Sequence, residues 1–414
     1  MKSLIKGQAI TFLFLCSFIF VKAQSISNSA YNVFGIGTLE QQGLVQYESM
    51  GNAAIGSRPH NIVNLKNPAA LNAIQGFTQI FDVGVTYSGL RQNANEETFQ
   101  SSFGGLHDLN YWFRANSRTA FSFGVSKFSD ATYDILDSQS GSNAIGRSDS
   151  RHIGEGGSSQ VYLASAYSLS PNLHFGLKSN FLFGGFQENE TVTIFDPSAQ
   201  LDIVSERSFV TATLEAGIQY QFLVSKFTRL VLGSTFRTGS SVDFDEDVQI
   251  ISNAGTSIDS LSSDTQSELY LPRKIGVGLG LESRSWMVNI DYEAENWGEN
   301  VNNEVLEYNN RFVSSFGVQF TRDPFSDKLL NRVAFRAGAG VHSNYLDIDG
   351  QSFLGRFYSA GIGIPINRGA ASINLAYQHY AHGTLESNLI QENTNTFSIN
   401  VSIRDVWFRK RAFD

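Results

Sequence analysis

The feature that most constrains the fold is an alternation of apolar and polar residues that recurs along almost the whole chain. Between Leu173 and Gly184, and again between Phe397 and Arg404, the apolar side chains fall on every second position. A period of two residues indicates β-strands, because successive side chains of a strand point to opposite faces. Fourteen segments show this pattern: Phe77–Ser88, Leu106–Arg114, Thr119–Phe128, Val161–Tyr167, Leu173–Gly184, Val210–Phe222, Leu230–Arg237, Ile275–Leu281, Trp286–Glu293, Phe312–Phe320, Val333–Val341, Phe357–Ile366, Ile373–Tyr377 and Phe397–Arg404.

The polar face and the connections distinguish a membrane barrel from a soluble β-sandwich, which would alternate too. The second face is mostly Gly, Ser, Asn, Gln and Thr, which suits a crowded interior better than a solvated surface. Short turns, such as Pro171-Asn172, alternate with long connections. The long connections are Gln92–Gly105, Tyr133–Ser158, Glu190–Ser208, Ser241–Ser267, Glu295–Asn310 and His342–Gly355. We therefore predict an all-β protein, an antiparallel transmembrane β-barrel of about 14 strands over residues 74–404.

The first 23 residues have the form of a secretory signal peptide. Lys2 and Lys6 precede an apolar stretch from Ile10 to Val21, and cleavage is expected near Ala23. Such a signal and such a barrel predict the bacterial outer membrane, with lipid and lipopolysaccharide as neighbours. The mature chain would keep 27 basic against 39 acidic residues, a net charge of −12, which argues against nucleic acid as a partner.

The stretch between the signal and the first strand has a different character. It is rich in Gly and Asn, as at Gly35, Gly43 and Gly51, and it shows no clean period of two. An irregular segment ahead of a closed sheet is expected to fold inside it, so residues 24–73 are predicted to form an N-terminal hatch in the lumen.

Several motifs resemble the long-chain fatty-acid transporter (FadL) family of outer-membrane barrels. Glu48–Ala54, Asn64 and the run Asn67, Pro68, Ala69, Ala70, Leu71 are similar to the family's hatch, and Leu271–Gly276 is similar to one of its strand starts. The resemblance implies a 14-stranded barrel with a hatch, and a hydrophobic substrate that leaves sideways through a kink in the third strand. Phe128, Ser129 and Asp130, where the alternation breaks, are the candidates for that opening. The basic tail, residues 405–414, departs from the family and resembles tails of Bacteroidetes relatives.

Charged residues on the predicted lumen face are the remaining candidates for a site. Arg114, Lys178 and Arg237 are cationic and could bind a substrate carboxylate. The acids Asp108, Glu215, Asp291 and Glu293 are expected to pair with such cations and to anchor the hatch.

Nothing in the sequence predicts an enzyme, a cofactor or a metal site. His379 and His382 are three apart on a strand and point to opposite faces, so they form a poor metal pair. The acidic stretch Asp243–Asp247 is either a solvated loop or a site bridging cations or lipopolysaccharide. No phosphate loop or nucleophile elbow is present.

Two functions are consistent with the sequence. The first is an outer-membrane channel for passive uptake of hydrophobic, fatty-acid-like small molecules, with hatch gating and a lateral exit. The alternative is a FadL-fold accessory or scaffold subunit of a secretion or assembly complex, which would bind a periplasmic or secretion-complex protein through its tail and long loops. An apolar pocket between hatch and wall would favour the first.

Overall fold

The computed structural model describes residues 29–406, apart from position 77 and the stretches 95–96, 140–147, 196–197, 253–256, 263–267, 301–305, 349–352 and 386–388. The predicted signal peptide and residues 407–414 of the predicted tail lie outside the described residues. Asp405, expected to begin the tail, still belongs to the last strand and pairs with Gln79.

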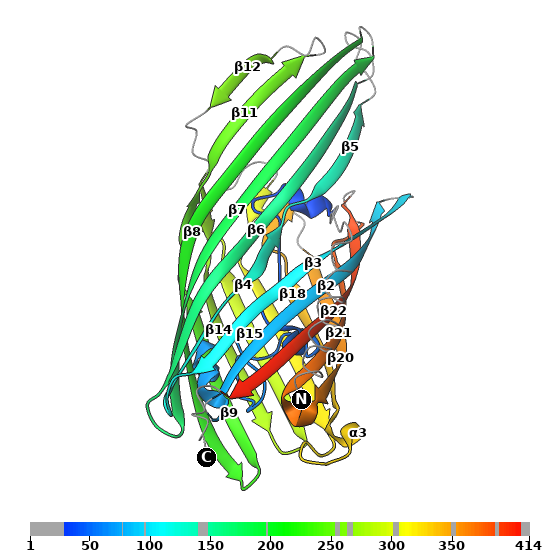
Figure 1. Cartoon of the computed structure of the whole chain (residues 1–414). Helices are drawn as coiled ribbons and strands as arrows, with labels where there is room; N and C mark the ends of the chain where they lie inside the picture. The colour runs from blue at the N-terminus through cyan, green and yellow to red at the C-terminus, as the bar shows by residue number, and fades with distance from the viewer. Residues whose placement is uncertain are drawn as a thin grey trace, which may run out of the picture.

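Fourteen antiparallel strands of the described chain close into a barrel, as predicted (Figure 1). Each overlaps one of the predicted segments, and the last strand pairs with the first from Gln391–Asn93 to Val406–Thr78. Closure leaves no sheet edge along most of the wall. The strands are β2 (Thr78–Ala94), β3 (Glu97–Arg114), β4 (Thr119–Asp130), β6 (Ser148–Ser168), β7 (Leu173–Phe195), β8 (Ser198–Ser225), β9 (Thr228–Arg237), β14 (Arg273–Glu282), β15 (Trp286–Asn296), β17 (Arg311–Thr321), β18 (Ala334–Ser343), β20 (Leu354–Ile366), β21 (Ala371–His382) and β22 (Gln391–Val406).

The outside of the barrel is apolar, whereas many inward-facing side chains are polar or charged. On β15, Ile290 is 53% exposed, whereas the next residue, Asp291, is 2% exposed. Aromatic residues sit at the short-turn end of the outer face, where the ring of Trp286 lies 4.5 Å from that of Phe320. This is the surface that a barrel presents to lipid and its interfaces. Among the described residues, no helix is both long and apolar enough to cross a membrane.

In their described residues, the long connections are largely strands and not loops, and here the sequence-based prediction is wrong. Strands β6, β7 and β8 continue far beyond the barrel and are joined by β5 (Tyr133–Gln139), β11 (Asp245–Ser252) and β12 (Ser257–Ser262). These six strands form a sheet, the extension, which rises above the barrel in Figure 1. The strands of the extension are held together by backbone pairing, and neither face of the sheet is wholly apolar. Apolar and polar residues therefore alternate too weakly there for the sequence to reveal these strands. Short strands also lie in other connections: β10 (Ser240–Asp243) with β13 (Glu268–Leu271), and β16 (Leu306–Tyr308) with β19 (Leu346–Ile348).

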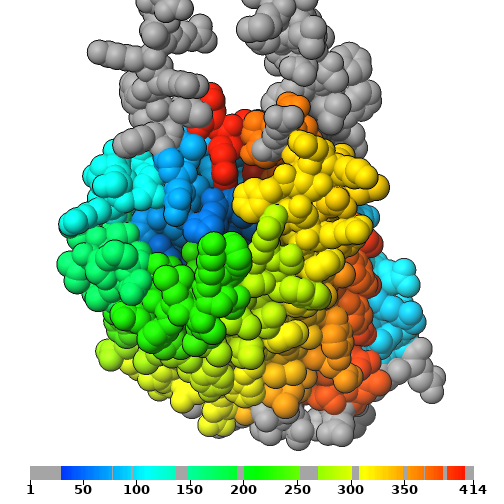
Figure 2. Space-filling model, turned by 90° about the horizontal axis from the view of Figure 1, so that it is seen from below, coloured from blue at the N-terminus to red at the C-terminus, as the bar shows by residue number. Residues whose placement is uncertain are grey.

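Residues 29–76, the N-terminal segment, lie inside the barrel. The segment contains η2 (Ala30–Val33), β1 (Thr38–Leu39), α2 (Val45–Glu48) and η3 (Pro68–Ala73). Viewed from the short-turn end, its darker blue atoms occupy the centre of the ring of strand ends (Figure 2). Its first residues lie at the opposite end, where Ser29 and the backbone N–H of Ala30 bind the Glu392 carboxylate.

Inward-facing glycines let the backbone of the N-terminal segment rest directly on the wall. A Cβ on Gly338 of β18 would collide with the backbone at Met50 and Gly51, and one on Gly233 of β9 would collide with the carbonyl of Ile55. Close approach of two backbones is a common reason for glycine within a strand.

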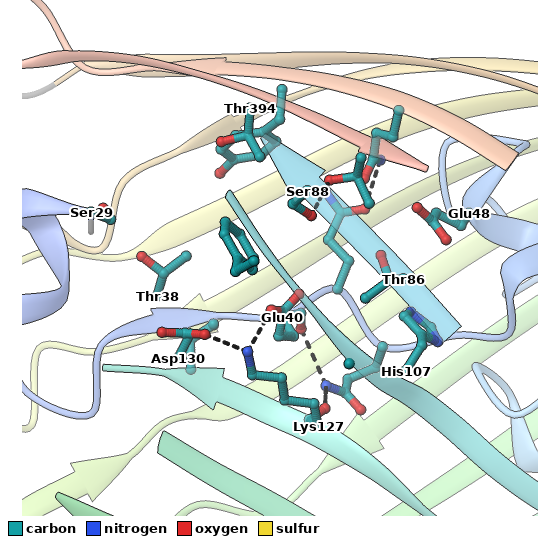
Figure 3. A pocket seen from close by; sticks show the side chains of 18 of the residues that line it. Ser29, Thr38, Glu40, Glu48, Thr86, Ser88, His107, Lys127, Asp130 and Thr394 are labelled. Atoms are coloured by element: carbon teal, nitrogen blue, oxygen red, sulfur yellow. Dashed lines mark hydrogen bonds and ion pairs between the residues drawn. The ribbon is translucent and has the colours of Figure 1, made fainter. Parts of the chain in front are cut away.

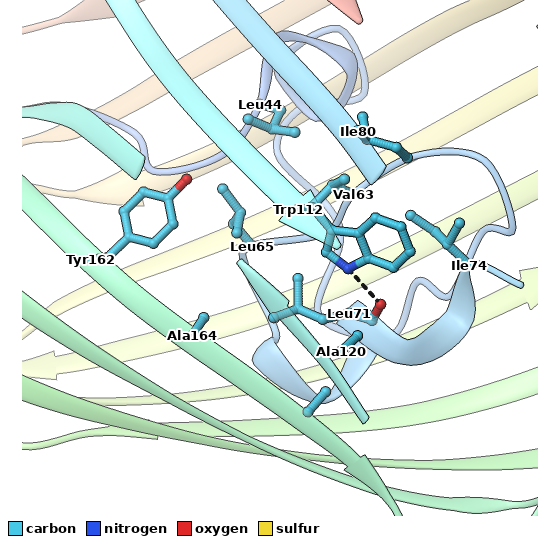
Figure 4. Packing of buried hydrophobic residues seen from close by; sticks show 11 residues of the cluster. Leu44, Val63, Leu65, Leu71, Ile74, Ile80, Trp112, Ala120, Tyr162 and Ala164 are labelled. Atoms are coloured by element: carbon cyan, nitrogen blue, oxygen red, sulfur yellow. Dashed lines mark hydrogen bonds between the residues drawn. The ribbon is translucent and has the colours of Figure 1, made fainter. Parts of the chain in front are cut away.

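The main apolar core lies between the N-terminal segment and β3. Trp112 is fully buried there and donates its indole N–H to the carbonyl of Leu71 at 2.9 Å (Figure 4). Leu44, Val63, Leu65 and Ile74 of the segment and Ile80, Ala120, Tyr162, Ala164 and Ala166 of the strands complete the cluster. A short remaining helix, α3 (Leu329–Arg332), and the turn η4 (Asn367–Gly369) lie at the short-turn end.

Candidate functional site: a cavity at a break in the barrel wall

The wall is interrupted between the second and third strands of the barrel. Pairing of β3 with β4 ends at Asp108–Ser126, and in the described chain residues 97–106 of β3 pair with β2 alone. The register of β4 against β6 shifts between Lys127 and Ser129, after which β5 takes over the pairing with β6. A register shift of this kind bends a strand out of its sheet. Phe128, Ser129 and Asp130, the candidates for a lateral opening, lie at this bend and are buried.

The N-terminal segment covers the break from inside. β1 adds to the bent end of β4 as a short antiparallel strand, with Thr38 opposite Asp130 and Leu39 opposite Ser129. The backbone N–H of Glu40 donates to the carbonyl of Phe128 at 2.9 Å. Lys127 forms ion pairs with Glu40 and with Asp130. The break is therefore closed by backbone bonds and charges that residues 38–42 supply.

Beside β1 lies a cavity of about 160 Å³ (Figure 3). For scale, a dry cavity of about 150 Å³ in another protein holds one benzene molecule. Much of the wall is apolar, from Leu39, Leu90, Phe103, Leu106 and Tyr380. Ionisable side chains also reach it, namely Glu40, Glu48, His107, Lys127, Asp130, Arg311, His382 and Glu392. The cavity can thus hold one small molecule that combines an apolar body with a polar group.

Most of these ionisable groups have partners. His382 Nε2 lies 3.2 Å from Glu392, and Arg311 Nη1 lies 3.2 Å from Glu295. Glu48 differs: its Oε1 accepts from Ser398 at 3.0 Å, but its buried Oε2 has no hydrogen-bond partner in the described chain. Burial raises the pKa of the Glu48 carboxyl, because water no longer solvates its charge. Asn52 Oδ1, also in the cavity wall, is likewise buried without a partner.

None of the three cations proposed to bind a carboxylate lines this cavity. Arg114 lies at the short-turn end, where it donates to the backbone carbonyls of Asn72, Ile74, Asn116 and Ser117. Lys178 Nζ lies 3.6 Å from Glu215 Oε2. Arg237 lies opposite Glu215 on the next strand, β9. Substrate binding by Arg114, Lys178 and Arg237 stays a prediction.

Lys178 and Arg237 belong instead to a row of charges across six strands. Cross-strand pairing places the six side chains in one line on the inner face, which we call the charged row: Lys178, Glu215, Arg237, Lys274, Glu295 and Arg311. Of this row only Arg311 reaches the cavity. Each of the two acids lies between two cations, so every cation of the row has an acid beside it, although Arg237 and Lys274 are also neighbours of like charge.

The Asn67–Leu71 signature is buried at the wall. Asn67 accepts from the N–H of Ala69 at 3.1 Å, which caps η3, and donates to the carbonyl of Ile55 at 3.0 Å. Acids of β15 also bind the N-terminal segment. Asp291 accepts from the N–H groups of Ala54 and Ile55 at 2.6 and 2.8 Å, and Glu293 is paired with Lys66.

Sequence reasoning missed most of the residues in the cavity wall. Glu40 and Glu48 lie in an irregular segment without a period that would assign them to a face. Glu392 lies between the last two alternating segments that the sequence reveals. The one usable signal was the interruption of the alternation at Lys127–Asp130, which marks the break.

The barrel is similar in fold to solved outer-membrane channels for hydrophobic compounds. The channel CymD, described as a monoaromatic hydrocarbon channel, matches with a TM-score of 0.59 and 14% identity over 92% of this chain and 100% of its own. A Pseudomonas aeruginosa FadL homologue matches at 0.58 and 11%, covering 88% of this chain and 99% of its own. The Pseudomonas putida toluene transporter TodX matches at 0.57 and 15%, covering 90% and 100%. At these identities the likeness establishes the fold, and it confirms the resemblance to the FadL family.

The family of the chain follows from its sequence. A model described as BamG matches residues 4–414, so the chain belongs to the BamG family. No curated protein sequence matches it.

Proposed function

We propose that this barrel is an outer-membrane protein for passive passage of small hydrophobic molecules, in which the N-terminal segment acts as a gating hatch. The observation that carries the proposal is the cavity of about 160 Å³ at the break between β3 and β4. The cavity has room for about one benzene ring and is lined in part by apolar side chains. It lies where the backbone pairing between β3 and β4 is interrupted. The fold shared with hydrocarbon channels supports the same function.

The proposed exit is lateral. The free part of β3 carries Leu106 on its outer face, 49% exposed, so a molecule leaving beside it would meet lipid rather than water. Release would require β1 to leave β4, which breaks few backbone bonds. Phe128, Ser129 and Asp130 would form the fixed side of this exit.

Filling the cavity should strongly weaken binding of a hydrocarbon without unfolding the barrel. Gly105 of β3 lines the cavity, and a Cβ there would meet nothing within 4 Å. We expect Gly105→Leu to reduce toluene binding to the purified protein by about tenfold or more, because the new side chain takes the space of the ligand. Uptake of labelled toluene by cells that carry each variant gives the second measurement.

Gly89 supplies the matched control. Its Cβ would also meet nothing within 4 Å, but Gly89 does not line the cavity. Gly89→Leu should bind and transport toluene like the parent. Equal loss in both variants, or equal activity, would contradict a role for the cavity.

The extension favours a second candidate, an accessory or scaffold subunit of an outer-membrane secretion or assembly complex. One face of the extension is polar and exposed, with Gln187, Glu206 and Asp247 in one cross-strand row. The other face carries the half-buried apolar residues Ile135, Val192, Leu201, Ile203, Val248 and Ile250. Glu188, Glu190 and Glu246 lie on this second face too, so the face is only partly apolar. Exposed apolar side chains outside the membrane are typical of a protein interface.

Shortening the extension separates the two candidates. Asn189 of β7 pairs with Val204 of β8, so residues 190–203 can be replaced by an Asn-Gly turn while the strands below stay paired. If the chain is a scaffold, this variant should lose its place in a large complex on native gels of solubilised membranes, and Gly105→Leu should keep it. If it is only a channel, toluene uptake should survive the shortening, and no large complex should be seen for the parent.

A further inference from the structure

The least satisfied part of the cavity is its acidic corner. Glu48 is 5% exposed and ends α2, and its carboxylate points into the cavity on the side of Thr86 (Figure 3). Oε2 of Glu48 and Oδ1 of Asn52 are both buried acceptors without a donor in the described chain. Buried acceptors are normally satisfied, because an unpaired one costs the free energy of its lost hydration.

The cations around the cavity are already engaged. Lys127 is shared by Glu40 and Asp130, and Arg311 is bound to Glu295. His107 Nδ1 lies 2.7 Å from Asp108 Oδ1, and when protonated its charge also acts on Glu48. Glu392 is paired with His382 and also accepts from Ser29, Ala30 and Gln92. Within the described residues, Glu48 is therefore the cavity carboxylate that has no cation within ion-pair distance.

The group that fits this corner is a hydrogen-bond donor with a positive charge. A metal ion is a poor fit, since no three His, Cys, Asp or Glu side chains of the described chain are grouped to hold one. A primary ammonium carries three donors, which suits a carboxylate oxygen and an amide oxygen. Leu90 and Phe103, in the wall of the same cavity, would contact an apolar body attached to it.

We propose that the cavity is a binding site for a small amphipathic primary amine, whose ammonium binds Glu48 and Asn52 and whose hydrocarbon part packs on Leu90 and Phe103. The volume of about 160 Å³ limits the ligand to roughly one ring with a short side chain. This inference rests on the cavity of the proposed function and adds to it the ligand class. A pure hydrocarbon would fill the space and leave both acceptors unsatisfied.

Two probes of nearly equal size separate the amine from the hydrocarbon. Binding of 4-fluorobenzylamine and of 4-fluorotoluene to the full-length protein in a nonionic detergent is measured by fluorine NMR, and the Gly105→Leu variant gives the partition into micelles. We expect the parent to bind the amine at least about tenfold more tightly, as for a hydrogen bond to a charged group. Glu48→Gln should lose that advantage and still bind 4-fluorotoluene, which also shows that it is folded. Glu155→Gln, an exposed acid of β6 outside the cavity, should behave like the parent.

The outcomes are distinguishable. If 4-fluorotoluene binds and the amine gains nothing over it, or if Glu48→Gln leaves the amine unaffected, the amine site is wrong and hydrophobic passage stands. If the amine binds and 4-fluorotoluene does not, the amine site stands and passage of hydrocarbons is wrong. A cavity that holds only water binds neither probe, which would overturn both proposals. Adding phosphatidylethanolamine tests the source of the amine: competition with the probe would identify a lipid headgroup, and its absence a free amine.

Discussion

Glu293→Gln is expected to lower the free energy of unfolding by about 3–5 kcal/mol, the usual cost of removing one partner of a buried ion pair. Glu293 is 6% exposed on the inner face of β15 and is shared by two lysines. Its Oε2 lies 2.8 Å from Lys274 of the wall, and its Oε1 is paired with Lys66 of the N-terminal segment. Glutamine keeps the shape of the side chain but leaves both ammonium groups without this counter-charge.

The measurement is denaturant unfolding of the refolded barrel, together with limited proteolysis. Because Lys66 holds the N-terminal segment to the wall, cleavage by trypsin within residues 29–76 should precede cleavage of the strands in the variant. Glu299→Gln is the matched control, since Glu299 lies 3.9 Å from Arg273 in an exposed pair that contributes about 0–1 kcal/mol. Equal effects of the two substitutions would show that the segment is not held by charge.

Trp112→Ala should be comparably destabilising, by about 3–5 kcal/mol, for a different physical reason. The indole is 0% exposed between β3 and the N-terminal segment, so alanine leaves a large void in that core. It also leaves the carbonyl of Leu71 without its donor. Trp112→Phe should cost less, because the ring is largely retained and one hydrogen bond, worth about 1 kcal/mol, is lost.

Trp286 provides the control for this second prediction. It is 51% exposed on the outer face of the same barrel, where it packs on Phe320. Trp286→Ala should therefore lower the free energy of unfolding in lipid vesicles much less than Trp112→Ala. Near-ultraviolet circular dichroism of each variant checks whether the packing of the core has changed. Should Trp286→Ala prove the more harmful, the N-terminal segment would contribute little to stability.

Glu293→Gln and Trp112→Ala are both expected to loosen the N-terminal segment, and they act on it from opposite sides of the barrel. Glu293 and Trp112 hold residues 29–76 to the wall far from β1, whereas Lys127 and the short β1–β4 ladder hold it at the break. A segment that gates the cavity should be firmly fixed along most of its length and weakly fixed at the exit. The N-terminal segment has this arrangement: buried contacts hold it to the wall along most of its length, and a two-residue strand pairing holds it at the break.

The sequence by itself determined the barrel strands, their approximate number and their two faces. Alternation is a local property: Ile290 faces out and Asp291 faces in because neighbouring side chains of a strand point to opposite sides. The same argument placed Lys178, Arg237 and Glu293 on the inner face before any pairing was known. It could not find the extension, because residues 185–195 and 198–208 pair through their backbone without a uniformly apolar face.

Only the tertiary structure decided which inner-face residues meet. The charged row depends on the register of six strands, which local periodicity does not specify, since a shift by two residues preserves every face. The pairing of β1 with β4 joins residues about 90 positions apart, and the cavity exists only because that pairing covers a break between β3 and β4. Glu48 becomes a candidate binding group only in the folded barrel. The residues packed around it, and not its neighbours in the sequence, bury its carboxylate and leave Oε2 without a hydrogen-bond donor in the described chain.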